Sequence, residues 1–153
     1  MIEIKNVTKK YGDKKAVDNV SFTVNDGDIF AFIGHNGAGK TTLIKSIVGI
    51  HDFDEGDILI DGKSIKKSPV ECKKNIAFVP HNPELYENMK AIDFINFICD
   101  MYEIDEEKRK ENIKKYAQLF EMEDSLNNTI DSFSHGMKQK VAIIAALCHD
   151  PKI

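Results

Sequence analysis

A glycine-rich segment at residues 34–41 constrains the fold of this 153-residue chain more than any other feature of its sequence. The segment reads GHNGAGKT and carries the required residue at every fixed position of the pattern G-x-x-x-x-G-K-[ST]. An apolar run, Ile29–Ile33, precedes it, and apolar residues at helical spacing follow it from Lys40 to Ile50. We therefore expect a buried strand, a loop and a helix in this order, as at the start of an α/β domain.

The residues of this loop suit the binding of a phosphate chain. Glycines let successive backbone N–H groups turn inward around an anion, and the following helix presents its N-terminus to the same anion. We expect Lys40 to reach the β- and γ-phosphates, the Thr41 hydroxyl to join the shell of a Mg²⁺ ion, and Thr42 to donate near the α-phosphate. The predicted ligand is a purine nucleoside triphosphate with Mg²⁺, and the alternative is a glycine-rich turn that binds nothing. The residues assigned to this site are Gly34, His35, Asn36, Gly37, Ala38, Gly39, Lys40, Thr41 and Thr42.

The composition excludes several other classes of protein. The chain has 21 Lys and Arg against 25 Asp and Glu. The resulting formal net charge of −4 argues against a protein that binds nucleic acid through an overall positive charge. The longest apolar run, Val141–Cys148, is far shorter than the ~20 residues that cross a bilayer. Three cysteines without a CxxC spacing are expected to be reduced thiols of a cytoplasmic protein.

Apolar patterning predicts the remaining elements of secondary structure. Strands are expected at Ile2–Val7, Val20–Val24, Ile29–Ile33, Asp57–Gly62 and Asn75–Val79. Helices are expected at Lys40–Ile50, Ala91–Tyr102, Glu106–Phe120 and Met137–Cys148.

The phosphate loop alone is shared by kinases, GTPases and ATPases, but the whole chain resembles the nucleotide-binding subunit of ABC transporters. The resemblance rests on four segments: Tyr11–Gly12, Ala16–Asp18, Gly34–Thr42 and Ser132–Lys140. The second glycine motif, in Ser132–Lys140, is specific to this family, and the similarity is to exporter-type ATPases in particular. The resemblance implies an α/β fold, a P-loop NTPase core of the ABC type with an N-terminal antiparallel β-subdomain and a helical subdomain, incomplete at its C-terminus. Residues 1–90 would form the β-subdomain and the phosphate-loop core of this single domain, and residues 91–153 mainly the helical subdomain.

The resemblance implies roles for four residues outside the phosphate loop. Tyr11 would stack on the adenine ring and Val17 would pack beside it, whereas the plainer alternative for Tyr11 is a half-buried aromatic residue at a strand end. Ser134 and Gly136 would complete the ATP pocket of a second subunit in a head-to-tail dimer, although Ser134 also suits a simple N-cap. Phe133 and Met137 stand where the family motif has leucine and glutamine.

His81 stands where the family has a glutamine that senses Mg²⁺ and the attacking water and links ATP to the membrane partner. An imidazole could accept a hydrogen bond from water, and the alternative is a loop residue with Glu84, or no residue, in the sensing role. The helix at 91–102 would form part of a groove that receives a cytoplasmic helix of the membrane subunit. Phe94, Phe97 and Tyr102 are the candidates for that interface, and core packing is the alternative for the apolar residues of this helix.

In the family, the chain continues after Pro151–Ile153 into a strand with the Walker B aspartate and the catalytic glutamate, and later reaches a switch histidine at the γ-phosphate. None of these falls within residues 1–153, so we assign no catalytic residue. We expect the parent protein to be an ATPase and these residues alone to bind nucleotide without hydrolysing it. Because the absent strand lies beside Phe30–Ile33 in the family, we also expect marginal stability or self-association.

The function implied by the resemblance is that of an ABC transporter ATP-binding subunit, which couples ATP binding and hydrolysis to transport through a separate membrane subunit. The expected cofactors are ATP and Mg²⁺. The expected partners are a second nucleotide-binding domain and the integral membrane subunit, with no nucleic acid, and the expected location is the inner face of the cell membrane. The alternative is a soluble ABC-type ATPase that acts on ribosomes or DNA.

Overall fold

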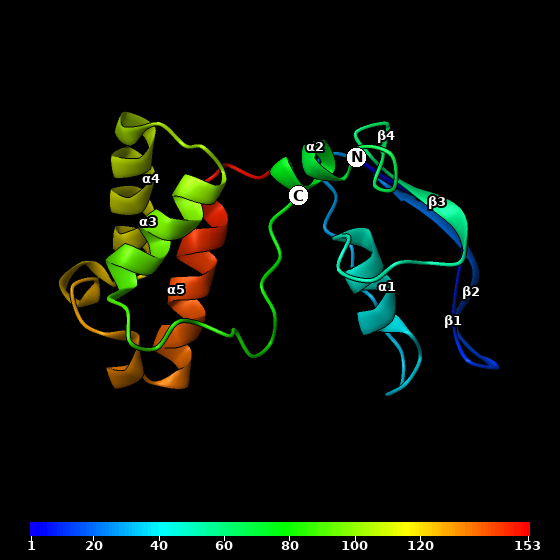
Figure 1. Cartoon of the computed structure of the whole chain (residues 1–153), viewed down its shortest axis with the longest axis horizontal. Coiled ribbons are helices and arrows are strands. Elements are labelled where there is room, and N and C mark those ends of the chain that lie inside the picture. Colours follow the sequence, from blue (N-terminus) through cyan, green and yellow to red (C-terminus); the bar gives the residue numbers. More distant parts are fainter. The chain divides into compact units, whose positions relative to one another are not determined.

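The computed structural model describes all residues 1–153 and divides into two compact units (Figure 1). The first unit comprises residues 1–76 together with Ile153, and the second comprises residues 77–152. Each unit has a hydrophobic core of its own. None of the helices combines the length and the apolar composition that a bilayer-spanning helix requires.

The first unit contains a four-stranded antiparallel sheet in the order β2-β1-β3-β4. Its strands are β1 (Ile2–Tyr11), β2 (Lys14–Val24), β3 (Glu55–Ile60) and β4 (Lys63–Ser64). β1 lies in the middle, where Ile4 pairs with Phe22 of β2 on one side and with Ile58 of β3 on the other. The alternating patterns correctly predicted strands at the start of β1, the end of β2 and within β3, and β2 extends further towards its N-terminus than predicted.

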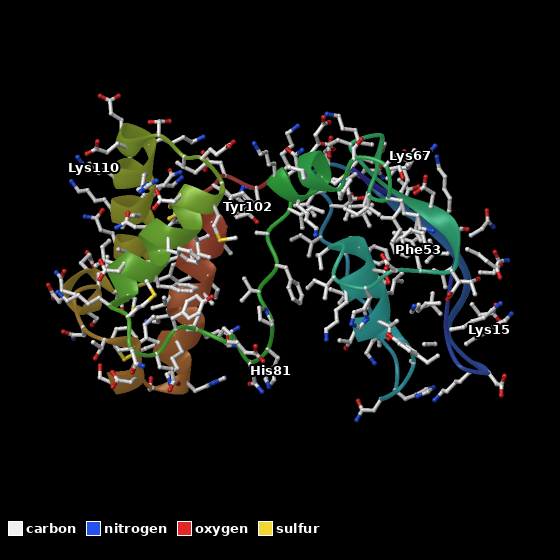
Figure 2. The ribbon with its side chains drawn as sticks, in the orientation of Figure 1. Lys15, Phe53, Lys67, His81, Tyr102 and Lys110 are labelled. Atoms are coloured by element: carbon white, nitrogen blue, oxygen red, sulfur yellow. The ribbon has the colours of Figure 1, made fainter.

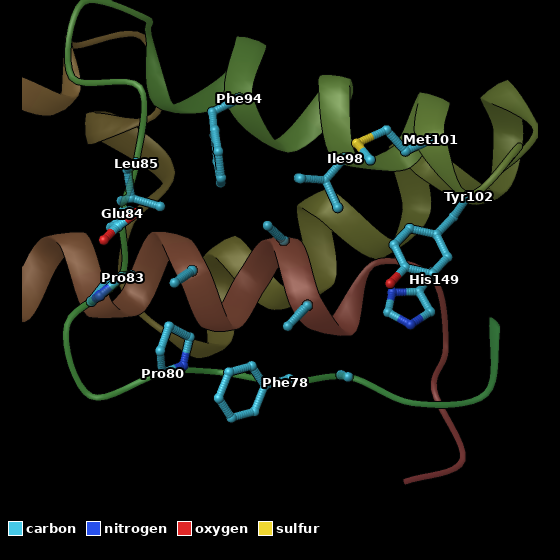
Figure 3. A pocket seen from close by; sticks show the side chains of 14 residues that line it. Phe78, Pro80, Pro83, Glu84, Leu85, Phe94, Ile98, Met101, Tyr102 and His149 are labelled. Atoms are coloured by element: carbon cyan, nitrogen blue, oxygen red, sulfur yellow. The ribbon is translucent and has the colours of Figure 1, made fainter. Parts of the chain in front are cut away.

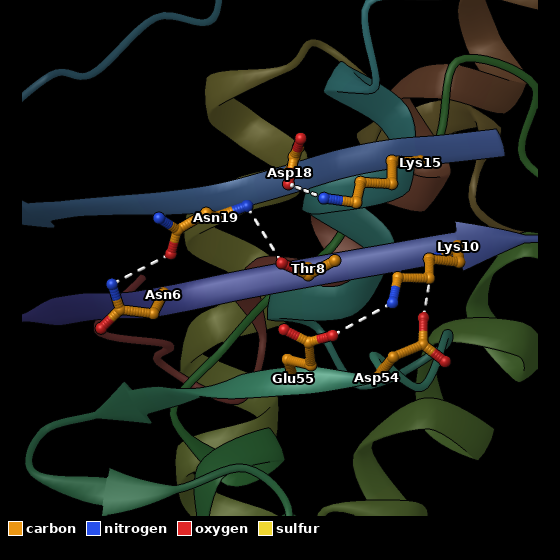
Figure 4. Close-up of polar contacts among 8 residues, drawn as sticks. All are labelled: Asn6, Thr8, Lys10, Lys15, Asp18, Asn19, Asp54 and Glu55. Atoms are coloured by element: carbon orange, nitrogen blue, oxygen red, sulfur yellow. Dashed lines mark hydrogen bonds and ion pairs between the residues drawn. The ribbon is translucent and has the colours of Figure 1, made fainter.

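Polar side chains hold the irregular part of the sheet (Figure 4). The register between β1 and β2 shifts between Ile4 and Lys9, where Asn6 and Asn19 adopt φ angles of 50° and 48°. The Asn6 amide donates to the side-chain oxygen of Asn19 at 3.0 Å, and the Asn19 backbone N–H donates to the Thr8 hydroxyl at the same distance. Asparagine tolerates the left-handed region better than most residues, which suits both positions. The two side-chain hydrogen bonds stabilise the strand pair where the register is irregular.

Two helices complete the first unit, α1 (Lys40–Ile47) and α2 (Pro69–Lys74). α1 begins directly after the glycine-rich loop, as predicted, and it buries Leu43 and Ile47 in the core. Phe53 belongs to the same core (Figure 2). The Lys66 ammonium lies 3.8 Å from the centre of the Phe53 ring. The buried residues of this core are Ile4, Val7, Val17, Leu43, Ile47, Phe53, Ile58, Ile60, Ile65, Cys72 and Ile76.

Two of the predicted strands do not form. Residues 29–33 and 75–79 belong to no strand, and the exposed fractions of Ile29 and Ile33 are 101% and 96%. An apolar run forms a strand only where neighbouring strands complete its hydrogen bonds, and no strand of this sheet pairs with either segment. Phe30 is instead stacked on Phe22 of β2, with a ring separation of 5.0 Å.

The second unit is helical, with α3 (Ala91–Met101), α4 (Glu106–Leu119) and α5 (His135–Leu147). These confirm the three predicted helices to within two residues at either end. Short 3₁₀ turns at Glu123–Ser125 and Ile130–Ser132 connect α4 to α5. All three cysteines of the chain are buried free thiols, as expected, and Cys99 and Cys148 contribute to the helical core.

Candidate functional site

The glycine-rich loop is shaped by a residue that no other amino acid can replace without strain. Gly39 has a φ angle of +84°, in the left-handed region that L side chains rarely adopt. A Cβ atom at this position would lie 2.1 Å from the carbonyl oxygen of Ala16 on β2. Gly37 has the same φ angle, but a Cβ there would meet nothing within 4 Å. The loop therefore packs against β2 at Gly39 and is open to solvent at Gly37.

The side chain of Lys40 contacts the backbone of the loop that precedes it. Its ammonium donates hydrogen bonds to the carbonyl oxygens of Gly34 and His35, the latter at 2.8 Å. The His35 ring nitrogen Nδ1 lies 2.9 Å from the carbonyl oxygen of Asn36. The ammonium thus lies within the loop and is satisfied by neutral carbonyl groups, which an anion could replace as stronger, charge-assisted partners.

A hollow of about 340 Å³ lies between the loop, the start of α1 and the first β-hairpin. Its lining residues are Tyr11, Lys14, Ala16, Asn36, Gly37, Ala38, Gly39, Lys40, Thr41 and Thr42. Seven of the nine predicted loop residues, together with Tyr11, therefore meet in one hollow, whereas Gly34 and His35 contribute carbonyl oxygens to Lys40 and do not line it.

The charge of this hollow suits an anion. Two lysines, Lys14 and Lys40, line it, and no carboxylate does. Residue 39, the N-cap of α1, is a glycine, so no side chain satisfies the N–H groups of the first helical turn. These groups and the helix dipole favour negative charge at the position that the loop surrounds.

Tyr11 and Val17 lie in different surroundings. The Tyr11 ring is 51% exposed and lines the hollow, and its hydroxyl lies 3.0 Å from Nδ1 of His51. Val17 is only 5% exposed and belongs to the core, where its side chain packs behind Gly39. Val17 does not line the hollow, and its predicted place beside Tyr11 at the ligand stays a prediction.

The other predicted site residues belong to the helical unit. Ser134 is the N-cap of α5, and its hydroxyl accepts a hydrogen bond from the Met137 N–H at 3.3 Å. Ser134, His135 and Gly136 are all exposed at this helix N-terminus. His81 is also exposed, and its ring centre lies 6.2 Å from that of His135.

Comparison with known proteins agrees with this geometry. The sequence profile of the ABC transporter family matches residues 17–153. The chain belongs to the ABC transporter family. It is 35% identical to an uncharacterized ABC transporter ATP-binding protein, YhcH of Bacillus subtilis, over 153 residues, which is all of this chain and 49% of that protein. The chain thus spans about half the length of this relative.

Solved structures place the fold in the same family. The structure of an ATP-binding subunit of an ABC transporter matches 99% of this chain and 63% of its own, with a TM-score of 0.92 and 31% identity. The ATP-binding cassette MJ0796, in a dimeric structure bound to ADP and Pi, matches 99% of this chain with a TM-score of 0.83 and 27% identity. The predicted fold class, an ABC-type P-loop domain with an antiparallel β-subdomain and a helical subdomain, is confirmed.

The helical unit of this ABC domain also contains an apolar cavity of about 260 Å³ (Figure 3). The segment 77–85 lines one side, α3 contributes Phe94, Ile98 and Met101, and α5 contributes three alanines. Tyr102 and His149 close one end, where their rings stack with centres 3.8 Å apart. Burial raises the pKa of the Tyr102 hydroxyl above its ordinary value. Of the three residues predicted at the partner interface, Phe94 and Tyr102 line this cavity and Phe97 does not.

Sequence reasoning missed three residues that line the hollow or contact its lining. Lys14 and Ala16 line the hollow, and His51 contacts Tyr11. The strand pairing of Tyr11 with Lys14 places that lysine beside the ring, and the Tyr-Gly-Asp turn between the two strands was the available signal for this hairpin. No local pattern links His51 to Tyr11, because they are 40 residues apart.

Proposed function

We propose that this chain is the nucleotide-binding part of an ABC transporter subunit, which couples ATP binding and hydrolysis to transport through a separate membrane subunit. The observation that carries the proposal is the hollow in which Tyr11, two lysines and the uncapped N-terminus of α1 meet. An aromatic ring at one side and a cationic anion-binding loop at the other fit the two ends of ATP. The chain is similar to a cassette whose structure holds ADP and Pi.

ATP would bind with its phosphate chain in the loop and its base against Tyr11. The Lys40 ammonium would exchange the carbonyl oxygens of Gly34 and His35 for β- and γ-phosphate oxygens. Thr42, which lines the hollow and is half-buried, would donate near the α-phosphate. The remaining loop residues would present backbone N–H groups to the anion.

The donor set fits a Mg²⁺ ion that arrives with the nucleotide. Nowhere in residues 1–153 do three His, Cys, Asp or Glu side chains gather to hold a metal ion. The exposed Thr41 hydroxyl lines the hollow, and one such oxygen suffices for Mg²⁺ when phosphates and waters complete the shell. When bound, the ion would neutralise phosphate charge. His81 belongs to the other unit and offers nitrogen, which Mg²⁺ does not prefer, so its role at the ion stays what the family resemblance implies.

Hydrolysis requires a group that positions or activates water. No carboxylate lines the hollow, so we propose that the full-length protein is the ATPase and that residues 1–153 bind ATP without turning it over. An assay of phosphate release from Mg-ATP by this chain and by the full-length protein tests this. Turnover by residues 1–153 at the rate of the full-length protein would contradict it.

The surfaces of the helical unit suit two protein partners. The exposed N-terminus of α5, with Ser134 and Gly136, would receive the γ-phosphate of ATP bound to a second nucleotide-binding domain in a head-to-tail dimer. The apolar cavity beside α3 would accept an amphipathic helix of the integral membrane subunit. That partner would hold the protein at the cytoplasmic face of the membrane, with no nucleic acid involved.

Equilibrium binding of ATP to two lysine variants tests the nucleotide site. Lys40→Ala removes the ammonium inside the loop and should abolish measurable ATP binding in calorimetry. Lys45→Ala is the matched control, because Lys45 is in the last turn of the same helix and does not line the hollow. Equal affinity of the two variants for ATP would refute the assignment of the loop.

A further inference from the structure

The hydroxyl of Tyr11 is held by a residue from outside the hairpin. It lies 3.0 Å from Nδ1 of His51, and the two rings meet edge to face with an interplanar angle of 82°. We propose that His51 is a positioning residue, which fixes the Tyr11 ring as a platform for the adenine base. The inference rests on the proposed function, because it assigns a role to His51 at the same nucleotide site.

His51 is itself fixed by the end of α1. Its backbone N–H donates to the carbonyl oxygen of Lys45 at 3.1 Å, and the N–H of Ile50 donates to the same oxygen at 2.8 Å. Gly49, with φ of +68°, allows the chain to turn back at this point. α1 therefore begins at the phosphate loop, and the turn that ends it carries His51. The base platform and the phosphate site are thus tied to one rigid element.

Tyr11 needs such a contact because little else restrains it. The ring is half exposed at the end of β1, and the ammonium of Lys9 lies over the ring at 5.3 Å from its centre. A free aromatic side chain would have to be immobilised when the base stacks, which lowers affinity. The hydrogen bond to His51 forms before the ligand arrives. Neutral Nδ1 accepts from the Tyr11 hydroxyl, and protonated Nδ1 donates to it, so the contact survives either charge state.

The test compares ligands with and without a base. Binding of ATP and of inorganic tripolyphosphate to the 153-residue chain is measured by calorimetry for wild type, His51→Phe, Tyr11→Phe and the double variant. His51→Phe keeps an aromatic ring but removes the hydrogen bond, and it should lower ATP affinity about three- to tenfold while leaving tripolyphosphate affinity unchanged. Tyr11→Phe should lower ATP affinity equally, and the double variant no further. His51→Asn, whose side-chain oxygen can take the place of Nδ1, should retain most of the wild-type affinity.

Three results would overturn the positioning role of His51. These are an unchanged ATP affinity of His51→Phe, an equal loss of tripolyphosphate affinity, and additive losses in the double variant. Each of them leaves ATP binding by the wild type intact and so spares the proposed function. A wild-type chain that binds neither ligand would refute the proposed function and this inference together.

Discussion

Replacement of Gly39 by alanine tests how the phosphate loop is built. The new Cβ would lie 2.1 Å from the carbonyl oxygen of Ala16, so the loop or β2 must move, and the φ angle of +84° is itself unfavourable for alanine. The left-handed conformation costs about 1–2 kcal/mol, and overpacking costs about 1–3 kcal/mol. Gly39→Ala should therefore lower the free energy of unfolding by roughly 2–5 kcal/mol.

Gly37→Ala is the matched control for this experiment. Its φ angle is identical, but a Cβ there meets nothing within 4 Å, so only the backbone cost of about 1–2 kcal/mol applies. Urea unfolding of both variants separates the backbone cost from the overpacking cost. The difference between the free energies of unfolding of the two variants measures the close contact with Ala16. Equal destabilisation by the two substitutions would refute the close packing of the loop on β2. Because the displaced loop misdirects its N–H groups, Gly39→Ala should also weaken ATP binding more than Gly37→Ala does.

Three further predictions concern other parts of the molecule. Ser134→Ala removes the N-cap of α5 and should lower the free energy of unfolding by about 1 kcal/mol in urea denaturation, with ATP binding by this chain unchanged. The hydrogen bond from Lys108 holds the pKa of Asp150 below its ordinary value, so this pair stabilises the fold at neutral pH. Its contribution to stability disappears as the pH falls through the folded-state pKa of Asp150. Lys108→Ala should return the pKa of Asp150 towards its ordinary value in an NMR titration. Ile29→Ser together with Ile33→Ser should reduce self-association in sedimentation experiments, and equal association of wild type and variant would contradict the role of this exposed apolar segment.

The sequence was sufficient to predict elements whose determinants are local. The helix at 106–119 has an aspartate, Asp105, whose side chain accepts from the Lys108 N–H, and the predicted boundary is within one residue of the observed one. The glycine-rich loop was predictable because its glycines supply the positive φ angles that other residues rarely adopt. Tyr11 was placed at the hollow through the family resemblance, and the structure brings it there.

Features that depend on distant partners were not predictable in this way. Ile29–Ile33 has the composition of a central strand, but strand formation depends on neighbours that pattern alone cannot supply. Val17 lies before the strand predicted at Val20–Val24, and its burial in the core depends on packing between distant segments, which no local pattern encodes. The contact between Tyr11 and His51 joins β1 to the end of α1 and leaves no periodic signal.

The central claim is that the hollow at the start of α1 binds the triphosphate of ATP. Backbone amide NMR of the 153-residue chain during titration with Mg-ATP tests it most directly. We predict that the largest chemical-shift changes fall on the amides of residues 37–42, with smaller changes at Tyr11 and His51. Tripolyphosphate should reproduce the changes at residues 37–42 but not those at Tyr11 and His51. Saturable binding that leaves the amides of residues 37–42 unshifted would contradict it.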